Sequence, residues 1–114
     1  MSSERKSLHD KIRVNTVIKL YTLTLLAEGP KHGYEIMKKL EEITGSSVGP
    51  SQVYPFLRQL EDAGIIKTTK IGPREKKLYE LTENGKSFVE DVLESSLTLI
   101  QAAINLLGKE RVCP

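Results

Sequence analysis

The sequence predicts a mainly α-helical fold with a small β-hairpin and one long helix at its C-terminal end. Apolar residues recur at helical spacing in three successive segments before residue 65. Two short runs suited to β-strands then flank a Gly-Pro turn. An apolar stripe from residue 83 to about residue 107 predicts the long helix. The 114 residues suit one compact domain with an appended element.

Composition narrows the class of protein. Hydrophobic residues make up 39% of the chain and charged residues 28%, which is typical of a soluble globular domain. No apolar run is long enough to span a bilayer and no signal-peptide pattern opens the chain, so we expect a cytoplasmic protein without a membrane partner. The single Cys113 excludes a disulfide framework within one chain and a cysteine-based zinc site. Its thiol could join two subunits or sense oxidation, but a free thiol is the commoner case.

Two helices are predicted in the first part of the chain. The first covers residues 8–27 and is apolar around much of its circumference, so it should be buried on more than one side. Glu28-Gly29-Pro30 ends it. The second helix runs from His32 or Gly33 to Thr44. Its apolar face consists of Tyr34, Ile36, Met37, Leu40 and Ile43.

A third helix follows the Gly- and Ser-rich turn at residues 45–49. Ser51 is the predicted N-cap, because its hydroxyl can accept a hydrogen bond from an amide of the first turn. Pro55 is then the first residue whose amide would be bonded within the helix, so at most one bond is lost. Gly64 supplies the left-handed residue that ends the helix. The buried face is predicted to hold Val53, Phe56, Leu57 and Leu60.

A β-hairpin is predicted after this helix. Its strands cover residues 65–71 and 76–81, and Gly72-Pro73-Arg74-Glu75 forms the turn. Two helices joined by a short turn make a helix-turn-helix, and the hairpin adds a wing. The predicted fold is therefore a winged helix-turn-helix domain plus a long C-terminal helix.

Thr82 is predicted to cap the last helix, which runs from Glu83 to about Leu107. Part of its apolar stripe alternates three- and four-residue spacings, like a coiled-coil seam. The far half of this helix has nothing left in its own chain to cover, so a second copy is the economical partner. The alternative is that it folds back on the first helix. The predicted dimerisation residues are Phe88, Val89, Val92, Leu93, Leu97, Ile100, Ile104 and Leu107.

The start of the third helix favours DNA reading. Its first turn displays Ser51, Gln52 and Tyr54, and Arg58 follows one turn later. Such a tip fits the major groove, where amide and hydroxyl groups address base edges and phosphates. Gln52 could bind adenine with both amide atoms or could only solvate a helix end. Tyr54 could reach DNA or pack its ring on the wing.

Positive charge is concentrated on the hairpin. The net charge of the chain is only +2, yet residues 65–81 carry five Lys or Arg against two Glu. Cations on a hairpin suit phosphate neutralisation or minor-groove insertion. An ordinary solvated hairpin, whose lysines discourage edge pairing, is the alternative. The predicted wing contacts are Lys67, Lys70, Arg74, Lys76 and Lys77.

The sequence favours neither an enzyme nor a metal protein. It contains no Gly-rich phosphate loop, no catalytic-triad order and no paired-carboxylate arrangement. His9 and His32 have no third ligand at metal-site spacing. We therefore expect no catalysis, no cofactor and no bound metal.

Three blocks of the sequence form a recognisable signature: His32-Gly33-Tyr34-Glu35-Ile36, Tyr54-Pro55-Phe56-Leu57-Arg58-Gln59-Leu60-Glu61-Asp62-Ala63-Gly64-Ile65-Ile66 and Tyr79-Glu80-Leu81-Thr82-Glu83-Asn84-Gly85-Lys86. In order and spacing, these blocks resemble the phenolic acid decarboxylase regulator (PadR) family. The resemblance covers about residues 20–90 and implies a winged helix-turn-helix transcription regulator, usually a repressor. Family members dimerise through the C-terminal region and bind palindromic operators. With one C-terminal helix, this chain resembles the short subfamily.

The resemblance implies roles for individual residues. It places the tip of the third helix on base edges, makes Arg58 a phosphate contact and assigns the hairpin cations to the wing. His32, Gly33 and Tyr34 open the second helix, whose amide end can face a phosphate. Some short members carry a tryptophan that stacks on flat ligands, and this chain has no Trp, so binding of such ligands is not supported.

Three hypotheses follow for the whole chain. The first is a homodimeric, sequence-specific regulator of transcription that binds double-stranded DNA. The second is a winged-helix module that docks a protein partner, since fold does not determine function. The third is a sensor whose dimer interface encloses an unidentified small effector, with space left near Ser95, Ser96, Ala102 and Ala103. The predicted organisation is a flexible segment 1–7, a DNA-binding domain 8–81, a dimerisation helix 82–108 and a tail 109–114.

Overall fold

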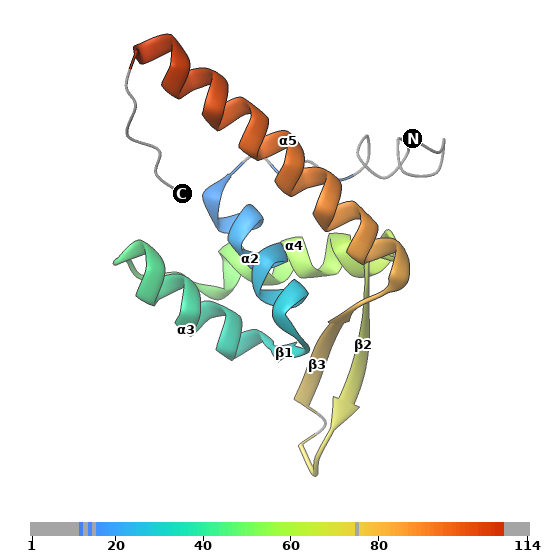
Figure 1. The fold of residues 1–114 in the computed structure, drawn as a ribbon. Helices are drawn as coiled ribbons and strands as arrows, with labels where there is room; N and C mark the ends of the chain where they lie inside the picture. The colour runs from blue at the N-terminus through green and yellow to red at the C-terminus, as the bar shows by residue number, and fades with distance from the viewer. Residues whose placement is uncertain (1–11, 13, 15, 75, 109–114) are drawn as a thin grey trace.

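The computed structural model describes residues 12, 14, 16–74 and 76–108 (Figure 1). Helices, hairpin and long helix follow one another in the predicted order, which confirms the mainly α-helical fold class. The predictions for residues 1–7, His9, Cys113 and the tail lie outside the described residues. The elements are α2 (Val17–Glu28), β1 (Lys31–His32), α3 (Gly33–Thr44), α4 (Pro50–Asp62), β2 (Ile66–Ile71), β3 (Lys76–Leu81) and α5 (Glu83–Leu107).

The first described helix starts later than predicted. Thr16 has an extended backbone, with φ of −137° and ψ of 157°, and its Oγ1 accepts a hydrogen bond from Lys19 N at 3.2 Å. Because this side chain accepts a hydrogen bond from an amide of the first turn, Thr16 is the N-cap and α2 begins at Val17. A single helix over residues 8–27 is therefore wrong, and Ile12 and Val14 are not helical. The predicted end at Gly29-Pro30 is confirmed.

The core is built around α2. This helix contacts α3, α4 and α5, which confirms that it is buried on more than one side (Figure 1). The hydroxyl of the fully buried Thr22 donates to Ile18 O at 2.7 Å, so its polar atom is satisfied. The four described helices and the segment before β2 contribute fully buried apolar side chains. Those with less than 2% of their surface exposed include Leu23, Ile36, Leu40, Val53, Leu57, Leu60, Ile65 and Phe88.

The start of α4 differs from the prediction. Gly49 is the N-cap and Pro50 the first helical residue, a position that proline favours because its missing amide has no intrahelical partner there. Ser51 is consequently inside the first turn. With this start, the amides of Val53 and Tyr54 are the first that can bond within the helix. Pro55 comes next and has no N–H, so the carbonyl of Ser51 lacks its intrahelical donor. The predicted buried face of α4 is confirmed.

The other end of α4 agrees with the prediction. Gly64 has a positive φ of 76°. Its amide donates to Glu61 O at 3.0 Å, and the amide of Ile65 donates to Leu60 O at 2.9 Å. These two bonds form the Schellman motif, in which buried Leu60 and Ile65 supply the accompanying apolar contact.

The sheet has three antiparallel strands in the order β1-β3-β2. The predicted hairpin is confirmed, with its first strand starting at Ile66. Strand β1 was not predicted, because two residues are too few to show a periodic pattern. Its residues Lys31 and His32 lie opposite Tyr79 and Leu78 of β3, so β1 joins the start of α3 to the hairpin.

The long helix α5 has the predicted N-cap and bounds. Thr82 Oγ1 accepts from Gly85 N at 3.0 Å, and Gly108 ends the helix with φ of 67°. Its first turns pack on α2, whereas its far half extends away from the domain (Figure 1). Phe88, Val89 and Val92 accordingly lie in the core of their own chain. The remaining predicted dimerisation residues, Leu93, Leu97, Ile100, Ile104 and Leu107, are exposed or half-exposed.

No described helix combines the length and apolar character needed to cross a bilayer.

The two isoleucines of α3 test where the core lies. Ile36 is 0% exposed and Ile43 is 59% exposed. We expect Ile36→Ala to lower the free energy of unfolding by about 2–5 kcal/mol, because it leaves a cavity. Ile43→Ala should change it by less than about 1 kcal/mol. Urea unfolding at one protein concentration measures both values, and equal losses would contradict this description of the core.

Candidate nucleic-acid interface

The exposed face of α4 carries the predicted reading residues. Burial of the opposite face turns Ser51, Gln52, Tyr54 and Arg58 toward the surface. The exposed Arg58 side chain makes no hydrogen bond or ion pair with the described residues, so its guanidinium is available to an anion. The tip and the cation one turn later are therefore presented on one helix, as predicted.

Gln52 has a structural role that the sequence reading did not include. Its Oε1 accepts a hydrogen bond from Gly49 N at 3.0 Å and thereby caps the start of α4. A two-atom contact with adenine uses both the oxygen and the nitrogen of the amide. Such a contact would require this cap bond to open, whereas the NH₂ group can donate while the cap is intact.

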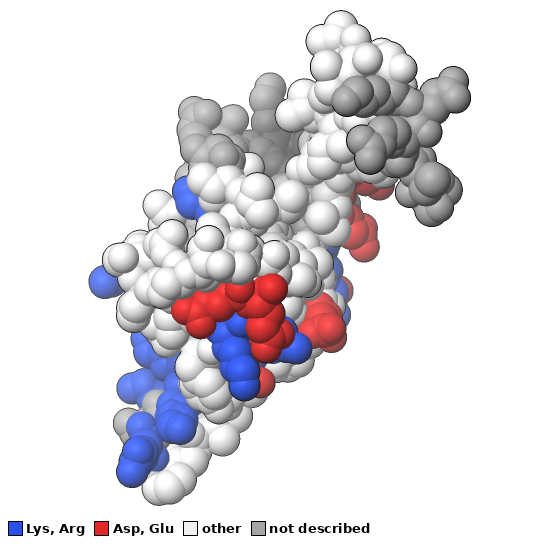
Figure 2. All heavy atoms as spheres, turned by 90° about the vertical axis from the view of Figure 1, so that its left-hand side faces the viewer, with Lys and Arg blue, Asp and Glu red and all other residues white. Residues whose placement is uncertain are grey.

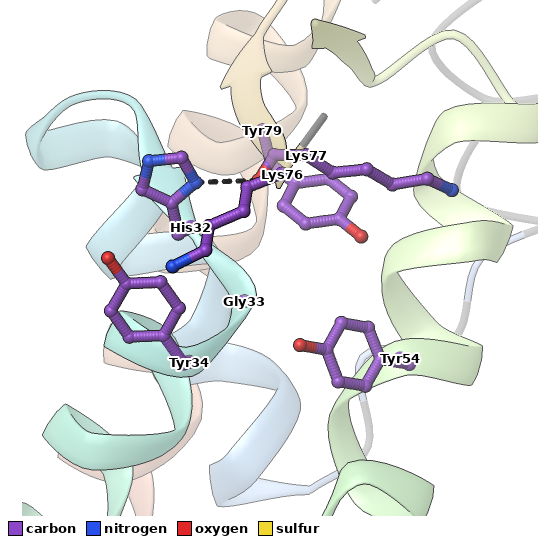
Figure 3. Close-up of a pocket in the computed structure, with 7 residues that line it drawn as sticks. All are labelled: His32, Gly33, Tyr34, Tyr54, Lys76, Lys77 and Tyr79. Atoms are coloured by element: carbon purple, nitrogen blue, oxygen red, sulfur yellow. Dashed lines mark hydrogen bonds between the residues drawn. The ribbon is translucent and has the colours of Figure 1, made fainter. Parts of the chain in front are cut away.

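A surface hollow of about 340 Å³ brings together the start of α3, the tip of α4 and strand β3 (Figure 3). The rings of His32 and Tyr34 lie to one side of Gly33, and those of Tyr54 and Tyr79 lie to the other. Three elements that are distant in the sequence thus share one site. The lining residues are His32, Gly33, Tyr34, Tyr54, Lys76, Lys77 and Tyr79.

His32 links the start of α3 to the wing. Its Nδ1 lies 2.8 Å from Lys77 O and, because a carbonyl only accepts, this nitrogen carries the proton. Its backbone amide donates to Glu35 Oε1 at 2.8 Å. The imidazole stacks on Tyr34 with ring centroids 5.4 Å apart, and Lys76 Nζ lies 5.4 Å from the centroid of the Tyr34 ring. These contacts hold a cation beside two aromatic rings.

Tyr54 packs over Gly33. A Cβ added at Gly33 would overlap the Tyr54 hydroxyl and lie 2.6 Å from Cε1 of its ring. Glycine therefore leaves the space that the Tyr54 ring occupies, and a side chain at this position would require the ring to move. The ring thus lies against the start of α3, a partner that the sequence did not predict, and contact of Tyr54 with DNA stays a prediction. The side chain remains 38% exposed, so the edge of the ring is still accessible.

Tyr79 is a site residue that the sequence analysis did not assign. It points from β3 toward the helices and is 5% exposed. Burial, followed by the neighbouring Tyr54 and Glu61, raises the pKa of its hydroxyl, which therefore stays a hydrogen-bond donor. The sequence signal that could have predicted its burial is the period of two along a strand, which places Tyr79 on the same face as Leu81.

The strand register divides the wing cations between two faces. Lys70 lies opposite Lys77, on the same face as Tyr79. Both side chains add positive charge to that face of the wing, and positive charge attracts a polyanion. On the other face, Lys67 forms a 3.7 Å ion pair with Glu80.

The remaining two wing cations lie nearer the tip of the hairpin. Lys76 shares the face of the Lys67–Glu80 pair, and Arg74 is exposed in the turn. Figure 2 shows Lys and Arg atoms gathered at the lower end of the molecule, at the height of the hairpin in Figure 1. The structure thus brings all five predicted wing cations onto one exposed ribbon.

Among the residues that the structure describes, no group of three or more His, Cys, Asp or Glu side chains could hold a metal ion.

The arrangement defines a winged helix-turn-helix protein. A family model described as "Transcriptional regulator PadR-like family" matches residues 22–91, and the chain belongs to this family. The predicted resemblance is thereby confirmed. The protein is 42% identical over 82 residues to "Negative transcriptional regulator PadR" of Bacillus subtilis (strain 168). That alignment covers 68% of this chain and 45% of the relative, so this chain spans less than half of the relative's length.

Solved structures agree with this assignment. The structure of Bacillus subtilis PadR in complex with operator DNA has a TM-score of 0.59 and 40% identity, and covers 68% of this chain and 47% of that one. The structure of H. salinarum RosR has a TM-score of 0.65 and 32% identity, and covers 75% of this chain and 77% of that one. The first of these proteins is a DNA-bound relative of the present fold.

Tyr79 should affect stability at alkaline pH. Its raised pKa means that the folded state keeps the proton where the unfolded chain loses it, so its contribution is full below about pH 10 and declines above. We expect Tyr79→Phe to lose stability less steeply than the wild type above about pH 10. Tyr34→Phe, at an exposed position, serves as the control. Urea unfolding across this pH range measures the effect, and a steeper loss in Tyr79→Phe would contradict it.

Proposed function

We propose that this chain is a transcriptional regulator, acting as a repressor, that binds a palindromic DNA operator as a homodimer. Helix α4 would enter the major groove, and the wing would lie on the flanking backbone. The observation that carries the proposal is the convergence of α4, the start of α3 and the wing around shared hollows. Because its proposed partner is DNA, we infer that the protein works in the cytoplasm.

A second hollow supports a place for the DNA backbone. It has a volume of about 480 Å³ and lies between α4 and β3. Arg58 and Lys77 supply positive charge to it, and Tyr54 and Tyr79 also line it. Glu61 and Asp62 line it as well, so a phosphate would be favoured near the two cations and repelled from the carboxylates. Lys77 borders both hollows and is therefore a central phosphate contact.

The similarity to Bacillus subtilis PadR also supports DNA as the partner. Bacillus subtilis PadR is called a negative transcriptional regulator, and it has been solved with operator DNA. Residues 22–91, which match the family model, hold α4 and the hairpin with the cations described above. A protein-docking module would have no need for five cations on its wing. The charge distribution therefore favours DNA over a protein partner.

The exposed half of α5 supports the dimer. Leu93, Leu97, Ile100, Ile104 and Leu107 follow one another at spacings of four, three, four and three residues. Leu99 and Leu106 lie outside this seam, on another part of the helix surface, and are 71% and 90% exposed. An apolar surface of this extent on one helix is typical of an interface, and a second copy covers it with the same residues.

Selection from a random duplex library at physiological salt tests the DNA-binding proposal. We expect an enriched inverted repeat. Gln52→Ala should relax the choice at one position per half-site, by about 1–3 kcal/mol of discrimination. Arg74→Ala, the matched wing variant, should weaken all sequences alike and lower the salt slope of binding by about 1. Equal binding to every duplex and to heparin would oppose the proposal.

Charge placed in the α5 seam tests the dimer. Leu97→Glu should give a monomer by size-exclusion light scattering, because the carboxylate would be buried without a partner. Affinity for the palindrome should then fall by at least about tenfold, since the two half-sites are no longer bound by linked subunits. Thr98→Glu, on the exposed face of the same helix, should stay dimeric. A dimeric Leu97→Glu would show that the interface lies elsewhere.

A further inference from the structure

The start of α5 is bonded directly to the end of α4. Thr82 N donates to Ile65 O at 3.0 Å, and Thr82 Oγ1 lies 2.6 Å from Gly64 O and 3.1 Å from Ile65 O. The same hydroxyl oxygen accepts from Gly85 N at 3.0 Å. Gly64 and Ile65 form the C-terminal cap of α4, and Thr82 is the N-cap of α5. The two caps are therefore one hydrogen-bonded unit.

Gly85 allows this close contact. A Cβ at this position would overlap the carbonyl oxygen of Ile65 and lie 3.0 Å from its carbonyl carbon. These are backbone atoms that cannot swing aside as a flexible side chain can. Gly85 is helical and buried, so it is required here by space and not by a left-handed backbone. Figure 1 shows the end of α4, the start of β2 and the start of α5 meeting at this place.

The bonded caps, called the joint below, lie at one end of the long helix α5, so a small change of angle there moves the far end of α5 by a large distance. Phe88, Val89 and Val92 rest on the core in the following turns, so this packing and the bonded caps together set the direction of α5. The 25 residues of α5 span about 37 Å at about 1.5 Å per residue. A tilt of about 10° at the joint would displace the far end by about 6 Å, or about two base-pair steps of about 3.4 Å.

We propose that Thr82 and Gly85 are positioning residues that set the distance between the two recognition helices of the dimer. They do so by holding α5 at one angle to α4. The consequence is a single preferred spacing between operator half-sites, determined by residues that touch no DNA. This inference rests on the proposed function, because it assumes that the exposed half of α5 joins two subunits.

Three variants and a control separate the joint from general stability. Thr82→Val removes the hydroxyl with little change in size and should allow the angle between α4 and α5 to vary more widely. Gly85→Ala pushes the helix start away from Ile65 and gives a new angle. Thr82→Ser keeps the hydroxyl and should behave as the wild type. Thr98→Val removes an α5 hydroxyl that donates to Glu94 O at 3.0 Å, far from the joint, and is the matched control.

Binding is measured on inverted repeats whose spacers differ by single base pairs, and on one isolated half-site. We expect the wild type to prefer one spacer. In Thr82→Val the ratio of best to next-best affinity should fall several-fold, and in Gly85→Ala the best spacer should change. Half-site affinity and the dimer fraction should stay within about twofold of the wild type in both. Unchanged spacer preference, or an equal loss on every duplex including the half-site, would overturn the proposal.

A second measurement is independent of DNA. Spin labels at Gln59→Cys in α4 and Asn105→Cys in α5, in a Cys113→Ser background diluted with unlabelled subunits, report the distance between the two helices. Thr82→Val should broaden the distance distribution and Gly85→Ala should shift it; Thr82→Ser and Thr98→Val should match the wild type. Identical distributions in all variants would show that Thr82 and Gly85 do not set the angle between α4 and α5.

The two measurements also separate this inference from the proposed function. If the wild type binds no inverted repeat while the distances change as expected, the proposed function fails and the joint still sets the angle. Should Gly85→Ala fail to fold, Thr82→Val decides the question alone.

Discussion

Burial of one face of α4 is the constraint on which the rest of the molecule depends. Val53, Phe56, Leu57 and Leu60 are almost completely removed from water, and this sets the rotation of the helix about its own axis. Every other side chain of α4 then has a determined direction. Tyr54 is directed onto Gly33, and Arg58 reaches solvent beside the wing. The same burial places Leu60 and Ile65 together at the end of α4, where α5 is attached.

The tip of α4 combines structural and binding roles in the same side chains. Gln52 caps the helix through its oxygen, and Pro55 removes the intrahelical partner of the Ser51 carbonyl. The Gln52 bond stabilises the start of the helix, whereas Pro55 costs it one hydrogen bond. Both leave polar groups of the first turns partly committed and partly free. A surface of this kind suits a partner that supplies its own donors and acceptors, as base edges and phosphates do.

Sequence reasoning predicted the charged part of the candidate site better than its aromatic part. Cations such as Lys77 and Arg74 were predicted because they cluster within one hairpin, where neighbours in sequence are also neighbours in space. Tyr79 and the contact of Tyr54 with Gly33 were not predicted. They depend on how α3, α4 and β3 meet, and no local pattern encodes the distance between elements that are far apart in the chain.

The sequence alone determined the order of the elements, the hairpin, the Gly64 end of α4 and both ends of α5. Each of these follows from a local signal: an apolar period, a capping hydroxyl or a glycine that accepts a positive φ. Tertiary structure decided the rest. It selected Gly49 over Ser51 as the cap of α4, paired β1 with β3 and divided the apolar stripe of α5 between core and surface. These outcomes depend on which surfaces meet, because burial against a distant element outweighs the small local differences between one cap or face and another.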